Sequence, residues 1–130
     1  MMKNLIPDKG SNGQAGENGR FPTRLMIKEA GTISFINVDD IIWFQALDYY
    51  VRIHTHSSSH LIRNSLNKLE QSLDPGKFLR IHRSTLVNFE AVKSLTPNTS
   101  GDYIVMLNNG TELKLSRTRK HVLDNFLRVR

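Results

Sequence analysis

The stretch Phe78-Leu-Arg-Ile-His-Arg-Ser-Thr-Leu-Val-Asn88 places polar residues at a short break between apolar residues that can enter a core. The apolar members are Phe78, Ile81, Leu86 and Val87. The polar members, which bring hydrogen-bond donors and acceptors to a turning backbone, are Arg80, His82, Arg83, Ser84 and Asn88. Taken alone, the basic side chains could bind a phosphate or a carboxylate, or could form an ordinary surface cluster.

On both sides of this stretch, short β-branched and aromatic runs alternate with turn signals, which predicts a mainly β fold. Ala30-Gly31 and Asn109-Gly110 predict tight hairpin turns, because Gly and Asn tolerate positive φ. Trp43, Phe44 and Phe78 are predicted to be core residues. The predicted strands are Leu25–Lys28, Thr32–Ile36, Ile41–Gln45, Tyr50–Thr55, His60–Arg63, Phe78–Ile81, Val92–Thr96, Tyr103–Leu107 and Thr111–Leu115.

Three segments favour helical turns instead. Asp39 and Asp40 predict the first turn of a short helical segment after Asn37. Ser65 can cap a short helix that ends before Asp74-Pro75-Gly76. The apolar side of that helix comprises Leu66, Leu69 and Leu73. A last helix is predicted from Ser116, and its apolar stripe would seal one end of the β core. That stripe comprises Val122, Leu123, Phe126 and Leu127.

Length and composition limit the protein to one module with ordinary globular usage. The chain has 130 residues, 38% of them hydrophobic, and its 18 basic and 12 acidic residues give a net charge of +6. That charge suits an acidic partner but also fits a solvated basic surface. Cysteine is absent, which excludes disulfides, thiolate zinc sites and cysteine nucleophiles. No apolar run approaches the length of a membrane span, so we expect a soluble, cytoplasmic protein.

The first 22 residues differ in composition from the rest. They hold four of the eight glycines among Ser, Asn and Gln, and they can bury too little apolar area to offset the entropy of ordering. We therefore expect residues 1–22 to form a flexible tail and residues 23–130 to form the folded domain.

Six short motifs occur in a fixed order between about residues 24 and 129. They are Asn37–Gln45 (Asn-Val-Asp-Asp-Ile-Ile-Trp-Phe-Gln), Asp48–Ile53, Ser65–Glu70, Phe78–Asn88, Leu107–Gly110 and Leu115–Arg117. In this order they resemble the LytTR DNA-binding domain of bacterial transcription regulators. The sequence departs from that pattern at Gln45, where the family commonly has an acidic residue.

The resemblance implies an elongated arrangement of small antiparallel β-sheets with short helices, which inserts loops into successive major grooves of double-stranded DNA. By resemblance, the base contacts would come from Asp48, Tyr49, Arg83 and Arg117. Binding sites in the family are typically direct repeats, so two molecules per DNA site are expected. Many members also carry a receiver domain of a two-component system, and some short ones are thought to be held by a membrane regulator.

The residue chemistry at these positions agrees with base contacts. Arg83 and Arg117 offer planar donor forks that match guanine O6 and N7. Tyr49 could pack on a thymine methyl or a sugar or donate to a phosphate, or it could be a half-buried hairpin aromatic. Asp48 favours a turn and could accept a hydrogen bond from cytosine.

Phosphate contacts are predicted from two parts of the chain. Residues 114–130 contain six basic residues against Asp124 alone, and unpaired amides at the start of the last helix favour an anion. The predicted contacts there are Lys114, Ser116, Arg119 and Lys120. Those predicted from the Phe78–Asn88 stretch are Arg80, His82 and Ser84.

Other functions are less well supported by the sequence. His54, His56 and His60 have no nearby carboxylate and are interpreted as surface or hairpin residues, so we expect no metal and no cofactor. A hydrolase using Ser84 and His82 lacks any supporting motif, and we expect no enzymatic activity and no small-molecule substrate. The main alternative is a basic protein–protein interaction module in a signalling system.

Overall fold

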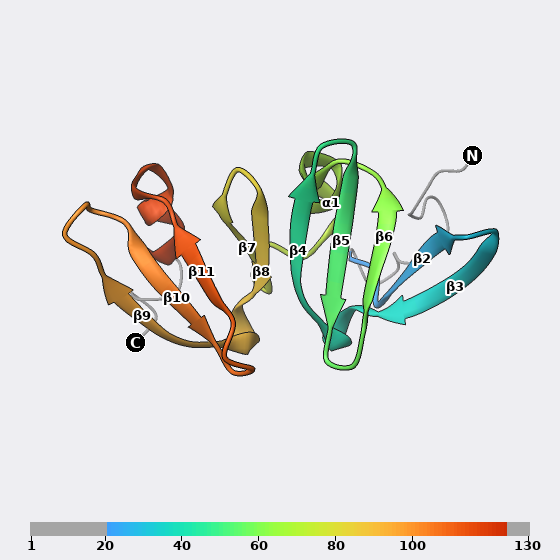
Figure 1. The fold of residues 1–130 in the computed structure, drawn as a ribbon, viewed down its shortest axis with the longest axis horizontal. Helices are drawn as coiled ribbons and strands as arrows, with labels where there is room; N and C mark the ends of the chain where they lie inside the picture. Colours follow the sequence, from blue (N-terminus) through green and yellow to red (C-terminus); the bar gives the residue numbers. More distant parts are fainter. Residues whose placement is uncertain (1–20, 125–130) are drawn as a thin grey trace.

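The computed structural model describes residues 21–124, which form three antiparallel sheets in a row along the longest axis (Figure 1). A two-stranded sheet contains β2 (Arg24–Glu29) and β3 (Thr32–Asn37). The central sheet has the order β6-β5-β4-β8-β7, and the third has the order β11-β10-β9. The central strands are β4 (Ile41–Leu47), β5 (Tyr50–Thr55), β6 (Ser59–Arg63), β7 (Phe78–His82) and β8 (Thr85–Asn88). The third sheet comprises β9 (Val92–Pro97), β10 (Tyr103–Leu107) and β11 (Glu112–Leu115). This elongated, mainly β arrangement confirms the predicted fold class.

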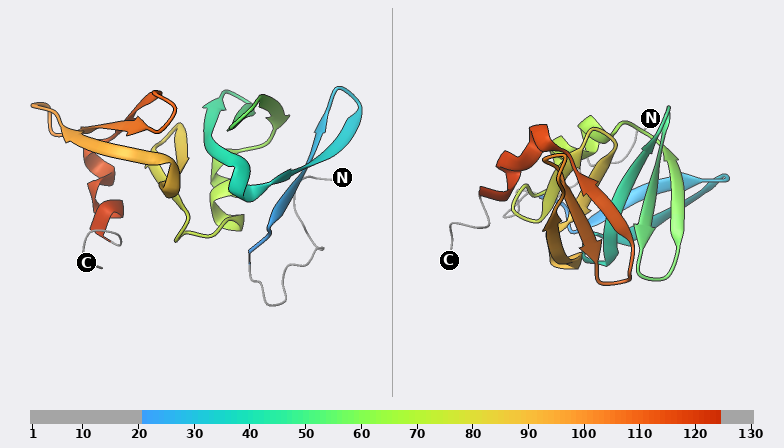
Figure 2. Two further views of the ribbon diagram at one scale, coloured as in Figure 1. Left: turned by 90° about the horizontal axis from the view of Figure 1, so that it is seen from below. Right: turned by 60° about the vertical axis from the view of Figure 1, so that its left-hand side comes forward.

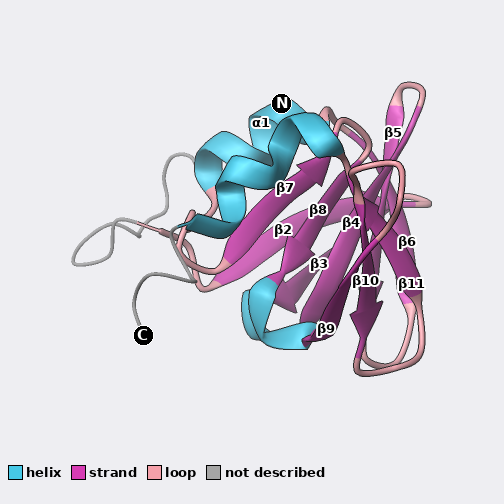
Figure 3. Cartoon of the chain, turned by 90° about the vertical axis from the view of Figure 1, so that its left-hand side faces the viewer, coloured by secondary structure: helices cyan, strands magenta, loops and turns pink. Residues whose placement is uncertain are grey.

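Three short helical segments join strands, and a fourth follows the last strand. They are η1 (Val38–Asp40), α1 (Leu66–Ser72), η2 (Phe89–Ala91) and η3 (Arg117–Leu123). Seen from below in Figure 2, α1 and η3 lie on the same side of the row of strands. Figure 3 shows the same arrangement from the end of the molecule.

Strands β7 and β8 of the central sheet are buried on both faces, so neighbouring residues of one strand enter different cores. In β7, Phe78 packs in the core that contains α1 and the β2–β3 hairpin, whereas Leu79 and Ile81 pack in the core that contains β10, β11 and η3. In β8, Leu86 and Val87 divide in the same way. This alternation follows from the two-residue period of a strand. The Phe78–Asn88 stretch therefore contributes side chains to both hydrophobic cores.

Local signals account for several helix starts and turns. The Ser65 hydroxyl accepts a hydrogen bond from the Lys68 amide at 3.1 Å, which confirms the predicted cap of α1. Ala30 (φ 52°) and Gly31 (φ 83°) both have positive φ, the feature of the tightest hairpins, and Gly110 (φ 90°) lies in the β10–β11 turn. The predicted turn after Asn37 is η1.

The strand prediction missed β8. Its four residues are all buried and carry adjacent apolar side chains, so they lack the alternation of a half-buried strand. The last helix begins at Arg117, one residue after its predicted start at Ser116, and its first seven residues are 3-10 helical. Leu123 is buried, and Val122 packs against the same core. Phe126, Leu127 and residues 1–20 of the predicted tail lie outside the described residues.

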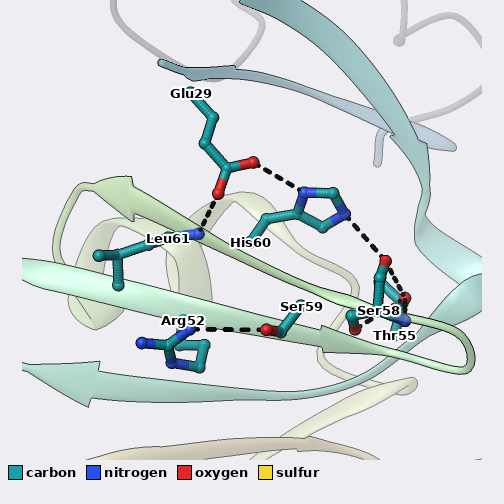
Figure 4. A network of polar contacts seen from close by, with 7 residues as sticks. All are labelled: Glu29, Arg52, Thr55, Ser58, Ser59, His60 and Leu61. Carbon is teal, nitrogen blue, oxygen red and sulfur yellow. Dashed lines mark hydrogen bonds and ion pairs between the residues drawn. The ribbon is translucent and has the colours of Figure 1, made fainter.

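One polar network fastens the β2–β3 hairpin to the central sheet (Figure 4). The Glu29 carboxylate on β2 accepts hydrogen bonds from the His60 ring at 2.9 Å and from the Leu61 amide at 2.8 Å, both on β6. These bonds lower the pKa of Glu29, with the Leu61 amide as the largest cause. The other nitrogen of His60 lies 3.2 Å from the Ser58 hydroxyl, so the ring is fixed on both sides.

Candidate nucleic-acid interface

Strand direction brings the predicted contact residues to one edge of the molecule. Strand β8 pairs antiparallel with both β4 and β7, so β4 and β7 run in the same direction and end at the same edge. The β4–β5 turn (Asp48 and Tyr49) and the β7–β8 turn (Arg83 and Ser84) therefore face the same way. The Ser116 amide donates to the Ile81 carbonyl at 2.8 Å, which joins the start of η3 to the end of β7. All three parts lie toward the upper side of Figure 1.

Arg80 lies beneath the β7–β8 turn and is only 8% exposed. Its guanidinium donates to the His82 and Arg83 carbonyls at 2.9 and 2.6 Å, and to the Asn67 and Glu70 side chains of α1 at 2.9 and 2.7 Å. Four of its five N–H groups are thus used within the protein. This position differs from the exposed phosphate contact that the sequence suggested. The alternation that places Phe78 on the α1 side places Arg80 there as well.

His82 is held as a neutral ring with a defined tautomer. Its Nδ1 accepts from the Ser84 amide at 3.1 Å and lies 2.9 Å from the Ser84 hydroxyl. Because an amide can only donate, Nδ1 carries no proton, and the neutral ring has its hydrogen on Nε2. Burial lowers the pKa of His82, and the nearby charges of Arg83, Lys114, Arg119 and Arg80 lower it further. These charges show that basic groups from three elements converge on this turn.

Arg83 is exposed at the tip of the same turn, where only its backbone carbonyl is bound, by Arg80. Within residues 21–124 its side chain has no hydrogen bond or ion pair. The guanidinium is therefore available to an external acceptor, on a backbone that is fixed from below.

The β4–β5 turn presents Tyr49 at its tip. Leu47 pairs with Tyr50, which leaves Asp48 and Tyr49 as the two loop residues. Asp48 has a φ of 54°, consistent with its predicted preference for a turn. Tyr49 is 74% exposed, which excludes the half-buried alternative. The Arg63 guanidinium lies 5.8 Å from the rings of both Tyr49 and Tyr50, which adds a cation beside this turn.

At the start of η3, Arg117 lies against the β9–β10 turn, which comprises Asn98–Asp102. Its Nη1 donates to the Ser100 carbonyl at 3.2 Å. Lys114 forms an ion pair with Asp102 at 3.4 Å, and Lys120 lies 5.9 Å above the Tyr103 ring. Arg117 and Lys120 are exposed and Arg119 is partly exposed. The Ser116 hydroxyl lies 3.3 Å from the Thr118 hydroxyl. The backbone amide of Ser116 donates to the Ile81 carbonyl, so only the Ser116 hydroxyl remains for a ligand.

The sequence did not reveal the residues that support these contacts. Asn67 and Glu70 hold Arg80, while Ser100, Gly101 and Asp102 contact Arg117 and Lys114. The signal for Glu70 was its place within the Ser65–Glu70 motif. The role of the β9–β10 turn had no sequence signal, because Gly101 precedes Arg117 by sixteen positions.

The three histidines of the β5–β6 region are dispersed. His54 stacks on Trp43 with ring centroids 4.3 Å apart and lies 3.0 Å from the Gln45 side-chain oxygen, while His60 is paired with Glu29. Burial lowers the pKa of His54, with a smaller effect from Arg52. The described part of the chain contains no cluster of three His, Cys, Asp or Glu that could hold a metal ion. Nor does any helix there have the length and apolar character needed to span a membrane.

Comparison with known proteins identifies the family and the fold of the chain. The family model described as the LytTr DNA-binding domain matches residues 31–128. The chain belongs to the LytTr DNA-binding domain family. A solved LytTr DNA-binding domain of a putative methyl-accepting/DNA response regulator from Bacillus cereus has the same fold. Its TM-score is 0.74 at 20% identity, and the match covers 82% of this chain and 98% of that one.

The chain also matches parts of longer proteins. The sensory transduction protein LytT of Bacillus subtilis is 27% identical over 124 residues, which cover 95% of this chain and 49% of that protein. The CO-responsive transcriptional regulator RcoM of Rhodospirillum rubrum is 35% identical over 75 residues, which cover 58% of this chain and 32% of that protein. The transcriptional regulatory protein LytR of Staphylococcus aureus is 27% identical over 101 residues, which cover 78% of this chain and 41% of that protein. The chain thus spans about half or less of the length of these relatives.

Proposed function

We propose that this LytTr domain binds double-stranded DNA in a sequence-specific manner as the DNA-binding part of a bacterial transcription regulator. The observation that carries the proposal is the convergence of three parts of the chain at one edge. The β4–β5 turn, the β7–β8 turn and the start of η3 each present an exposed side chain suited to a base or a phosphate. In this proposal the three parts enter successive major grooves.

The proposed roles follow from the exposure and donor geometry of each side chain. Arg83 and Arg117 would read bases through two parallel donors each. Asp48 and Tyr49 would contact bases from the β4–β5 turn. The proposed phosphate contacts are the Nε2–H of His82, the hydroxyls of Ser84 and Ser116, and the cations of Lys114, Arg119 and Lys120. Arg80 is assigned to positioning the β7–β8 turn, because its donors already bind protein acceptors.

Phosphate neutralisation predicts a strong dependence on salt. If Z phosphates are neutralised, log affinity falls with log salt concentration with a slope of about −0.9Z. The domain would act by binding alone, without a cofactor or a chemical reaction. We further propose that two copies occupy a direct-repeat site, that the protein works in the cytoplasm, and that a receiver domain or a membrane regulator controls it.

Selection of binding sites from random double-stranded DNA, followed by footprinting at physiological salt, tests the proposal. We expect enrichment of one motif, repeated in the same orientation, and protection of successive major grooves. Equal affinity for any polyanion, heparin included, would instead favour a basic protein–protein interaction module. Loss of a hydrolytic activity in a Ser84→Ala variant during a broad substrate screen would favour the hydrolase alternative.

A further inference from the structure

The side chain of Arg117 lies directly on Gly101 of the β9–β10 turn. A Cβ atom added at Gly101 would lie 2.7 Å from Cδ of Arg117 and 3.4 Å from its Cγ. Only glycine at this position therefore leaves room for the arginine stem. The Ser100 carbonyl next to it accepts a hydrogen bond from Nη1 at 3.2 Å, which fixes the end of the side chain as well.

The β9–β10 turn is closed by hydrogen bonds among its own residues. The Asn98 amide donates to the Asp102 carbonyl at 2.8 Å, and the Gly101 amide donates to the Asn98 carbonyl at 3.1 Å. The Ser100 hydroxyl donates to the Asp102 carboxylate at 2.6 Å. Gly101 has a φ of 97°, a backbone conformation that side chains disfavour. None of these bonds involves Arg117.

We propose that the β9–β10 turn is a positioning and specificity-determining element for DNA binding, in which Gly101 and the Ser100 carbonyl hold Arg117 in place before DNA arrives. This inference rests on the proposed function, because it assumes that Arg117 reads a base. A free arginine side chain loses rotamer freedom when it is fixed. Holding the stem in the free protein reduces that loss on binding. The bond to Ser100 uses one of five N–H groups, which leaves enough donors for a bidentate contact with guanine.

The same turn also restrains non-specific attraction. Asp102 lies 3.4 Å from the Lys114 ammonium, and its hydrogen bond with Ser100 is the largest cause that lowers its pKa. A carboxylate at this edge repels phosphates of every DNA sequence equally. The turn therefore favours discrimination between sequences over general affinity for DNA.

The test compares Gly101→Ala with Gly110→Ala in the full 130-residue protein. Both glycines have positive φ, near 97° and 90°, so both variants carry the same kind of backbone strain. Gly110 has no atom within 4 Å of an added Cβ, so it is the matched control without an arginine contact. We expect Gly101→Ala to weaken cognate binding by about tenfold and random-sequence binding by much less, with little change for Gly110→Ala. Equal effects of the two substitutions on the ratio of cognate to random affinity would overturn the inference.

An Arg117→Ala background separates this inference from the proposed function. If Gly101 acts through Arg117, Gly101→Ala should have no further effect on specificity once Arg117 is removed. If Gly101→Ala lowered specificity by the same factor in the Arg117→Ala protein as in the unaltered protein, the inference would be contradicted. If Arg117→Ala itself leaves specificity unchanged, the base-reading role assigned to Arg117 fails instead.

A measurement on the unaltered protein keeps the inference testable if Gly101→Ala unfolds. NMR relaxation of the arginine Nε–H groups in the free protein should show Arg117 more ordered than Arg83, whose side chain has no bond among the described residues. Equal mobility of the two side chains on the ps–ns timescale would overturn the inference.

Discussion

The β7–β8 and β4–β5 turns leave the same sheet at the same edge, yet they are built in opposite ways. The β7–β8 turn is fixed from below by Arg80, which binds two of its carbonyls and joins them to α1. The β4–β5 turn has no side-chain hydrogen bond to Asp48 or Tyr49 in the part of the chain that the structure describes. The β7–β8 turn is therefore supported by a buried side chain, whereas the β4–β5 turn is a free tip without such support.

This difference predicts which substitutions affect folding and which affect only binding. Removing the support of the β7–β8 turn leaves two carbonyls without their donor, which costs stability. Removing an exposed side chain from either tip leaves the interior unchanged. Substitutions along this edge should therefore lower either the stability of the fold or the affinity for DNA, depending on whether the side chain is buried or exposed.

Arg80→Met should have the largest effect. Loss of the buried guanidinium removes four hydrogen bonds and leaves the Glu70 carboxylate without its partner, so we expect the free energy of unfolding to fall by about 3 kcal/mol. Urea denaturation measures this loss. The exposed Arg63→Met is the matched control, with an expected change within about 0.5 kcal/mol. Similar stability losses for both variants would mean that the support beneath the β7–β8 turn is not structural.

Arg83→Ala should weaken binding without weakening the fold. The side chain is exposed on a fixed backbone, so we expect a loss of about 1–3 kcal/mol in binding to the cognate duplex, and a stability within about 0.5 kcal/mol of the unaltered protein. Isothermal titration on cognate and shuffled duplexes, together with urea denaturation, measures both quantities. A stability loss as large as that of Arg80→Met would remove the distinction between support and tip.

Arg117→Ala and Lys120→Ala should differ in kind. We expect the first to relax preference at one base pair, and the second to weaken all sequences alike and to reduce the salt slope by about 1. Binding to a panel of single-base variants at several salt concentrations checks both outcomes. Equal losses on cognate and random DNA for both variants would contradict these roles.

Tyr49→Ala should have a smaller effect than either arginine substitution. The ring lies at the free tip and contributes one exposed contact, so we expect about fivefold weaker cognate binding, or roughly 1 kcal/mol. Thermal unfolding should be unchanged, because Tyr49 is 74% exposed. A clear fall in Tm would show that the β4–β5 turn also depends on its side chains.

The smallest expected effect is a change in the titration of His82. In the free protein, burial and nearby basic groups lower its pKa below the ordinary value of 6.5. DNA phosphates would favour the charged ring, so the pKa of His82 should rise in the complex. The affinity for DNA should then increase as the pH falls, because the complex binds the proton more readily than the free protein. NMR titration of the ring with and without cognate DNA measures the change, and the ring signals of His56 on the opposite edge serve as the control. An unchanged His82 titration would place phosphates away from the β7–β8 turn.

The sequence predicted the strands with strong period-two patterns and the turns with Gly or Asn, because those signals are local. It missed β8, whose burial on both faces removes the alternating pattern. The predicted break in the Phe78–Asn88 stretch is the turn between β7 and β8 that carries Arg83, and Arg117 lies at the start of the last helix, as the sequence predicted. The sequence did not predict that Arg80 would be buried, because the partners Asn67 and Glu70 come from a separate helix. The support of Arg117 by Gly101 depends in the same way on a contact between distant parts of the chain.

Mapping backbone amide chemical shifts during titration with a cognate duplex tests the central claim most directly. We predict the largest changes at Asp48–Tyr49, Arg83–Ser84 and Arg117–Arg119, with small changes at the β5–β6 and β10–β11 turns on the opposite edge. The largest changes at that opposite edge, with Arg83 and Arg117 unaffected, would contradict the account.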